Sequence, residues 1–167
     1  MNKIQIVIAI LFICTSLNMD GFAQNAQEEN AVKEVIARLF KGMESGDTAT
    51  MHKTFVSGAT LVSVSRDKNN EPVLEQESSI NDFLKAIGKP HPEPYFEEFW
   101  NVKILIDGDL AQAWCDYGFY IGKKFNHCGV DAFHLHKGKE GWKIFHLADT
   151  RRKTGCEIPK EVQDRHR

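Results

Sequence analysis

The sequence has few of the residues that mark specialised classes of protein. It contains 4 cysteines and 5 prolines among 167 residues, and its formal net charge is −2. This composition is not that of a disordered chain, and the near balance of charge excludes the basic footprint of a nucleic-acid-binding protein. No two cysteines are spaced as CxxC, which excludes a thioredoxin-like redox motif and a zinc knuckle. The 42% of hydrophobic residues is typical of an ordinary globular domain.

The sequence also lacks an apolar run of membrane-spanning length. The run at residues 4–17 is shorter than the roughly 20 residues that a bilayer requires. Lys3 precedes this run, and the small residues Gly21 and Ala23 follow it, as in a cleaved signal peptide. We therefore expect a signal peptide at residues 1–23, export to the periplasm or the medium, and no stable membrane insertion after cleavage. An uncleaved anchor is the alternative.

The rest of the chain divides into a helical first part and a strand-rich second part. Helical spacing of apolar residues predicts a helix over residues 25–46, with its buried face formed by Val32, Ile36, Leu39, Phe40 and Met43. Asn25 and Glu28 resemble a helix-capping pair. Two more helices are expected, one from Asp47 to Gly58 and one after Ser79 that Gly88 ends. Strands are predicted at residues 59–67, 94–107, 110–121, 125–137 and 142–150.

This order of elements predicts the fold class and the domain boundaries. Helices followed by a meander of long strands indicate an α+β domain, with three N-terminal helices packed on a curved, mostly antiparallel sheet. We place this cone-shaped domain at residues 24–156 and a charged C-terminal tail at residues 157–167.

Two tight turns in the meander predict which side chains share a face. A turn at 122–123 pairs Ile121 with Lys124, and a loop at 138–141 pairs Lys137 with Trp142. Regular alternation then gathers aromatic and ionisable side chains on one face. That face comprises Trp114, Asp116, Tyr120, His127, Asp131, Phe133, Leu135, Trp142, Ile144 and His146. The opposite face, which carries Cys115, Tyr117 and Phe119, is nearly apolar and suits packing or dimer formation.

A mostly apolar face with a few converging polar groups is typical of a small-molecule pocket. We expect its walls to be formed by Trp114, Tyr120, Phe133 and Trp142, and its ligand to be oriented by Asp116, Asp131, His127 and His146. Burial raises the pKa of a carboxyl group, so Asp131 becomes a candidate general base with His127 as its partner. Alternatively, these ionisable groups are structural and form hydrogen bonds in a half-polar core.

Three further expectations concern metals, cysteines and the C-terminal residues. His134 and His136 share a face at chelating spacing but lack a matching carboxylate there. His127, Asp131 and His146 could form a two-His-one-carboxylate set, but the two histidines lie on different strands, so we expect no tight metal, and no cofactor is indicated. Cys128 lies near the end where the last strand exits, and a Cys128–Cys156 disulfide would attach the tail to the sheet. Arg152 is expected to attract an anionic group at the pocket rim, while Asp149 and Arg151 form a local ion pair.

The chain resembles the nuclear-transport-factor-2-like superfamily, and in particular its SnoaL-like and lumazine-binding branch of exported bacterial proteins. The resemblance covers roughly residues 28–156 and depends on "AWCDYGFYIGKKFNHCGVDAF" at 113–133 and "EGWKIFHLADTRRKTGC" at 140–156. It implies a cone whose sheet and helices enclose a pocket, often in a dimer packed through the other face of the sheet. Enzymes of the superfamily, such as ketosteroid isomerases and polyketide cyclases, use an aspartate with a histidine or tyrosine for proton transfer.

These observations favour an exported homodimeric protein that binds a small organic molecule. A second hypothesis is an isomerase, cyclase or dehydratase that uses Asp131 as general base. A third is a dimeric association module without a ligand, in which aromatic side chains would fill the pocket and the face carrying Cys115 would be required for assembly.

Overall fold

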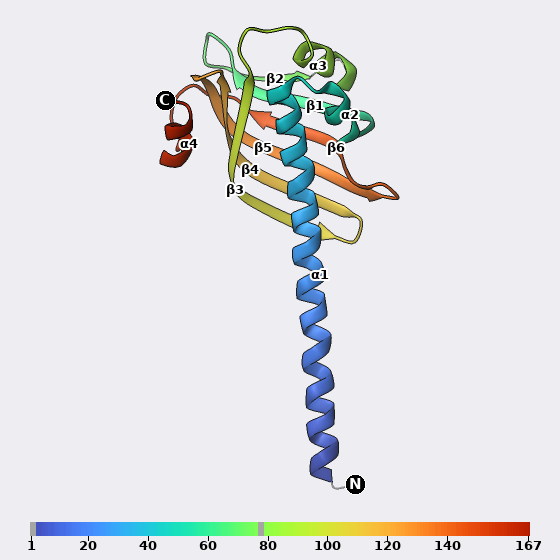
Figure 1. Ribbon diagram of the computed structural model, residues 1–167. Coiled ribbons are helices and arrows are strands. Elements are labelled where there is room, and N and C mark those ends of the chain that lie inside the picture. Colours follow the sequence, from blue (N-terminus) through green and yellow to red (C-terminus); the bar gives the residue numbers. More distant parts are fainter. Residues whose placement is uncertain (1–2, 77–78) are drawn as a thin grey trace.

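Figure 1 shows the computed structural model, which describes residues 3–76 and 79–167. The elements are α1 (Lys3–Ser45), α2 (Thr48–Lys53), β1 (Phe55–Arg66), β2 (Pro72–Gln76), α3 (Ile80–Ile87), β3 (Tyr95–Asp107), β4 (Leu110–Ile121), β5 (Lys124–Gly138), β6 (Gly141–Thr150) and α4 (Lys160–Arg165). The predicted α+β class is confirmed. The side chains of residues 1–23 lie outside the described part, so the signal peptide stays a prediction.

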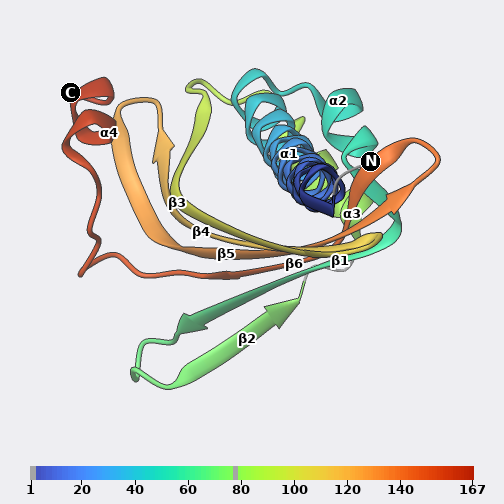
Figure 2. The same ribbon diagram turned by 90° about the horizontal axis from the view of Figure 1, so that it is seen from below.

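The strands form a six-stranded sheet in the order β2-β1-β6-β5-β4-β3. Neighbouring strands run antiparallel except for β1 and β6, which are parallel. Figure 2 shows that the sheet curls around α1, with α2 and α3 on the same concave side, while the β1–β2 hairpin projects away from the helices. Within the residues that the structure describes, no helix is both long enough and apolar enough to cross a membrane.

The helix α1 supplies one wall of the core through the predicted apolar face. All five predicted residues are buried, namely Val32, Ile36, Leu39, Phe40 and Met43. Burial of a large apolar side chain stabilises a fold by about 1.5–3 kcal/mol, so this face anchors the helix in the hollow. The predicted helix start at Asn25 is wrong, because α1 begins at Lys3. Glu28 instead accepts hydrogen bonds from Lys137 Nζ at 2.6 Å and Trp142 Nε1 at 2.8 Å on the sheet.

The two short helices are capped as the sequence predicts. Asp47 accepts a hydrogen bond from the backbone of Thr50, and Ser79 accepts one from the backbone of Asp82. Gly88 follows the last residue of α3, as expected. However, α2 ends at Lys53 rather than near Gly58, because the buried Phe55 already pairs with Ile144 of β6.

Two β-bulges make the predicted face assignments partly wrong. Both turns are as expected, with Ile121 opposite Lys124 and Lys137 opposite Trp142. Beyond each turn, however, the pairing shifts by one residue, so Asp131 lies opposite Cys115 and Asp149 rather than opposite Trp114 and Ala148. Since one extra residue reverses the side-chain alternation between paired strands, the neighbours of Asp131 change completely.

The C-terminal tail is attached to the sheet at two places. The predicted Cys128–Cys156 disulfide is present, and Cys128 and Arg152 exchange two backbone hydrogen bonds of 2.9 Å. Further on, Arg165 of α4 donates to Glu98 at 2.7 Å, and His166 stacks on Tyr120 with ring centroids 3.9 Å apart. Tyr120, predicted as a pocket wall, is therefore covered by the tail.

Candidate functional site

A cavity of about 190 Å³ lies between the helices and the concave face of the sheet. Helices α1 and α3 contribute Leu39, Phe40, Met43, Phe83 and Ile87, all apolar. The sheet contributes the polar side, which consists of Ser63, Glu97, Tyr117, His127, Asp131, Asp149 and Arg151. A mostly apolar hollow with polar groups gathered on one wall is the usual construction of a ligand site.

The carboxyl groups of Glu97 and Asp131 lie within hydrogen-bonding reach of each other on this wall. The side chain of Asp131 comes from the middle of β5 and is only 1% exposed. Burial, and then the negative charges of Glu97 and Asp149, raise the pKa of Asp131 well above its usual value. Burial and the charge of Asp149 also raise the pKa of Glu97, to about 8. At neutral pH the pair therefore holds a proton that either carboxyl group can carry.

Asp149 differs from this pair because hydrogen-bond donors surround it. Ser63 Oγ donates to Oδ1, while Tyr117 OH at 3.1 Å and Arg151 Nε at 2.7 Å donate to Oδ2. These donors hold the Asp149 carboxylate in a fixed position on the polar wall. Burial and the nearby carboxylates in turn raise the pKa of Tyr117 above its usual value, which keeps the phenol protonated and able to donate.

His127 lies at the outer end of the polar wall, where it packs edge-to-face against Tyr117 with ring centroids 5.6 Å apart. Burial, and secondarily the positive charge of Arg151, lower the pKa of His127 to about 4. The imidazole is therefore neutral at physiological pH and offers a hydrogen-bonding group without a charge.

The arrangement can carry out acid–base chemistry on a small molecule. When one member of the Glu97–Asp131 pair is ionised it can accept a proton, and the other, as a carboxylic acid, can donate one. Asp149, held by Arg151 and Tyr117, supplies a fixed charge beside them. Among the residues that the structure describes, no group of three or more His, Cys, Asp or Glu side chains is placed to hold a metal ion.

Of the residues predicted for this site, the structure places His127 and Asp131 at the cavity and most others elsewhere. Trp114 is 48% exposed on the outer face, and Asp116 accepts a hydrogen bond from Asn101 on that face. His146 is bonded to Thr60, also outside, at 2.7 Å. Phe133 and Trp142 are buried in the core, and Arg152 borders an adjoining hollow. The assignment of Cys115, Tyr117 and Phe119 to the face opposite the pocket is wrong, because Tyr117 and Phe119 line the cavity and Cys115, fully buried, pairs with Asp131.

Glu97, Tyr117 and Asp149 belong to the site but were not predicted from the sequence, and Arg151 was predicted only to form a local ion pair with Asp149. That pair is present at 2.7 Å, but it faces the cavity. One available signal was the position of Asp149 and Arg151 two residues apart, on the same side of β6 as the apolar Leu147. No comparable signal marks Glu97, because β3 carries charged residues on both sides.

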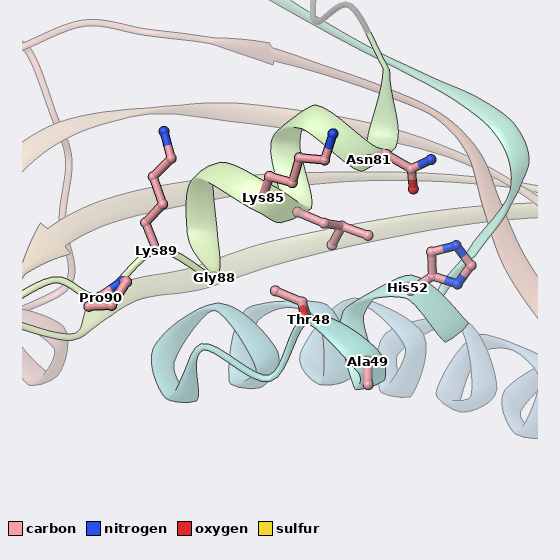
Figure 3. A pocket seen from close by; sticks show the side chains of 9 residues that line it. Thr48, Ala49, His52, Asn81, Lys85, Gly88, Lys89 and Pro90 are labelled. Atoms are coloured by element: carbon pink, nitrogen blue, oxygen red, sulfur yellow. The ribbon is translucent and has the colours of Figure 1, made fainter.

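A wider hollow of about 730 Å³ lies between α2 and α3, but it lacks the chemistry of the cavity. Figure 3 shows Thr48 and His52 on one side of it and Asn81, Lys85 and Lys89 on the other. No carboxyl group lines this groove, and its lysines have no buried partner there. The smaller cavity, with its paired acids, is therefore the candidate site.

The comparisons with known proteins agree with this architecture. The family model described as "Putative lumazine-binding" matches residues 27–146. An NTF2-like protein of unknown function from Shewanella baltica is 24% identical, with 77% of this chain and 97% of that chain covered at a TM-score of 0.59. An NTF2-like protein with a cystatin-like fold from Novosphingobium aromaticivorans is 13% identical, with 84% and 92% covered and a TM-score of 0.65.

A third structure, called a putative scytalone dehydratase and also from Novosphingobium aromaticivorans, is 12% identical, with 83% and 93% covered and a TM-score of 0.63. At these identities the structures show a shared fold. None of the curated proteins compared with this chain matches it. Because the family model covers most of the domain, the chain belongs to the lumazine-binding family of the nuclear-transport-factor-2-like superfamily.

Proposed function

We propose that the protein binds a small organic molecule in this cavity and transfers a proton to or from it through Glu97 and Asp131. The observation that carries the proposal is Oδ2 of Asp131, which is buried without a hydrogen-bond donor. A buried polar atom without a partner costs about 1–3 kcal/mol, and such a cost is commonly retained at functional sites. The reaction class that fits is isomerisation or dehydration next to a carbonyl group.

The size of the cavity limits the ligand. A cavity of about 150 Å³ accommodates benzene, so a hollow of about 190 Å³ accepts one substituted ring rather than a fused ring system. The apolar wall from α1 and α3 would hold the ring, while the carbonyl side would face the acids. The name of the dehydratase-like structure from Novosphingobium aromaticivorans supports the same reaction class.

The test is solvent-exchange catalysis with a panel of single-ring enolisable ketones in D₂O, followed by proton NMR. We expect the wild-type protein to accelerate deuterium incorporation at the carbon next to the carbonyl of at least one compound. Asp131→Asn and Glu97→Gln should each reduce this rate by about 10²-fold or more, since general acid–base catalysis contributes about 10²–10⁴. Asp116→Asn, on the outer face, is the matched control. Acceleration that survives both cavity substitutions would refute the assigned roles, and binding without exchange would indicate a carrier protein.

We also propose export and self-association. The predicted signal peptide at residues 1–23 and the Cys128–Cys156 disulfide, which persists in oxidising compartments, support export. Intact mass measurement on material from the native host would detect cleavage near residue 23. The outer face supports a homodimer, because it exposes large apolar side chains that monomeric proteins rarely gather, among them Leu105 at 71%, Leu110 at 51% and Trp114 at 48%.

A further inference from the structure

A second hollow of about 610 Å³ adjoins the cavity and shares two of its residues, His127 and Arg151. It is formed where the end of β1 meets the segment that follows β6. We call this hollow the vestibule. Because the same two side chains border both spaces, a molecule longer than the cavity can extend into the vestibule.

The vestibule is strongly cationic. Its lining carries the cationic residues Arg66, Lys68, Arg151, Arg152 and Lys153, against a single carboxylate, Asp67. That carboxylate is occupied in the β1–β2 turn, where its Oδ1 accepts from the backbone N–H groups of Asn69 at 2.8 Å and Glu71 at 2.9 Å. Apart from Arg151, which is paired with Asp149, the cations Arg66, Lys68, Arg152 and Lys153 therefore stay available to a ligand.

The positive field extends to the junction with the cavity. Positive charges on Arg151 and Lys153 both contribute to the lowered pKa of His127, after the larger effect of burial. Asp149 offsets the charge of Arg151, because its carboxylate accepts from Arg151 Nε at 2.7 Å and from Nη2 at 3.5 Å. An anion at the vestibule side of His127 would thus be attracted by several cations at once.

The backbone that carries these cations is held at fixed points. Arg151 N donates to Val64 O at 2.9 Å, and Arg152 exchanges its two backbone hydrogen bonds with Cys128. The disulfide between Cys128 and Cys156 also links the segment after β6 covalently to β5. A cationic site on a fixed backbone loses less entropy on binding than one on a free tail.

We propose that the ligand carries an anionic group, a carboxylate or a phosphate, which binds in the vestibule while its ring enters the cavity. This inference rests on the proposed function of the cavity and adds the charge of the ligand. The anion would select the ligand and orient its reactive carbon toward Glu97 and Asp131.

The experiment compares the binding of 3-phenylpropionate, 2-phenylethyl phosphate and the neutral 3-phenyl-1-propanol by NMR titration of the ¹⁵N-labelled protein. We expect at least one of the two anions to bind about tenfold more tightly than the alcohol, which corresponds to one charge-assisted hydrogen bond. The comparison of the anions separates carboxylate from phosphate recognition. Raising the ionic strength from about 0.01 M to about 1 M, where the Debye length falls from about 30 Å to about 3 Å, should weaken anion binding only.

A charge-matched pair of variants locates the effect. Arg152→Gln with Lys153→Gln should abolish the preference for the anions and leave the alcohol unaffected. Lys85→Gln with Lys89→Gln removes the same charge from the groove in Figure 3 and should preserve the preference. The inference would be overturned if both double variants lost the preference for the anions equally, or if the wild-type protein bound the anions and the alcohol with equal affinity. Binding of heparin without binding of either anion would also overturn it.

The proposed catalysis can fail independently of this inference. Asp131→Asn should retain the preference for the anions, because it leaves all the vestibule cations in place. If the wild-type protein shows that preference but catalyses no solvent exchange, the proton-transfer proposal fails and the vestibule assignment stands.

Discussion

The carboxyl group of Asp131 combines almost complete burial with an oxygen that lacks a hydrogen-bond donor. The buried thiol of Cys115 lies opposite it on β4 and offers no charge to stabilise the ionised form. Glu97 provides the second carboxyl group, so the shared proton is the least costly arrangement for the pair. At the scale of single residues, burial of the two carboxyl groups therefore lowers the stability of the fold, and it produces a pair that can exchange protons near neutral pH.

This cost predicts how stability depends on pH. Folding raises the pKa of both acids, so the folded state binds protons more tightly than the unfolded state above about pH 4. The contribution of the pair to stability is therefore complete below the unfolded pKa values and is lost as pH rises toward about 8. Urea denaturation of the wild-type protein should show a free energy of unfolding that falls over this range, by about 1.4 kcal/mol for each unit of raised pKa.

Substitution of one acid should remove part of that slope. Asp131→Asn is expected to unfold at higher urea concentration than wild type at pH 8, and at a similar concentration at pH 4. Asp116→Asn, on the outer face, should keep the wild-type slope. A slope that Asp131→Asn leaves unchanged would show that Asp131 does not hold the proton.

At the scale of elements, the site depends on how closely β5 approaches the end of β6. A Cβ atom added at Gly129 of β5 would lie 1.7 Å from the carbonyl oxygen of Thr150 and 2.7 Å from the ring of Tyr117. The same carbonyl oxygen accepts a hydrogen bond from Tyr117 OH at 3.0 Å. Only glycine therefore fits at position 129, where β5 lies close to the end of β6. This close approach lets Tyr117 reach both Asp149 and the carbonyl oxygen of Thr150.

Gly129→Ala should consequently destabilise the protein strongly. Overpacking commonly costs about 1–3 kcal/mol, and more where backbone must move, so we expect about 3 kcal/mol or more in thermal or urea unfolding. Gly138→Ala, on the same strand, is the control, because its Cβ atom would be 3.7 Å from the nearest heavy atom. It should change stability by no more than about 0.5 kcal/mol. Equal effects of the two substitutions would contradict the close approach.

At the scale of the whole molecule, the curved sheet separates two surfaces with different roles. Its concave face holds the helices, as Figure 2 shows, and the cavity lies between them and the sheet. Its convex face exposes Leu105, Leu110 and Trp114. Dimerisation through the convex face would cover these side chains without closing the cavity. The predicted dimer face containing Tyr117 and Phe119 is unsuitable, because these residues line the cavity.

Sedimentation velocity tests this arrangement. The wild-type protein should sediment as a dimer, and Trp114→Asp should shift it to monomer because a charge would be buried at the interface. Lys139→Asp, in the exposed β5–β6 turn, serves as the control and should remain dimeric. A wild-type monomer at high protein concentration would exclude the dimer, and the cavity would be unaffected.

The sequence by itself determined the local features of this protein. The apolar face of α1, the caps Asp47 and Ser79 and the two hairpin turns were all predictable, because each depends on residues close together in the chain. The Cys128–Cys156 disulfide was also predictable, since few other pairings were open to three cysteines. The same local reasoning placed His127 and Asp131 together.

Only the tertiary structure decided which residues share the cavity. One extra residue at each bulge reverses the alternation beyond it, and periodicity does not reveal where a strand bulges. As a result, Trp114 and His146 lie on the outer face rather than on the predicted pocket face, and Asp149 and Arg151 line the cavity with Asp131. Glu97 reaches the same wall from β3, two strands away from Asp131, because the sheet curls around α1. That curvature arises from the packing of the whole sheet on its helices, so no single stretch of sequence encodes it.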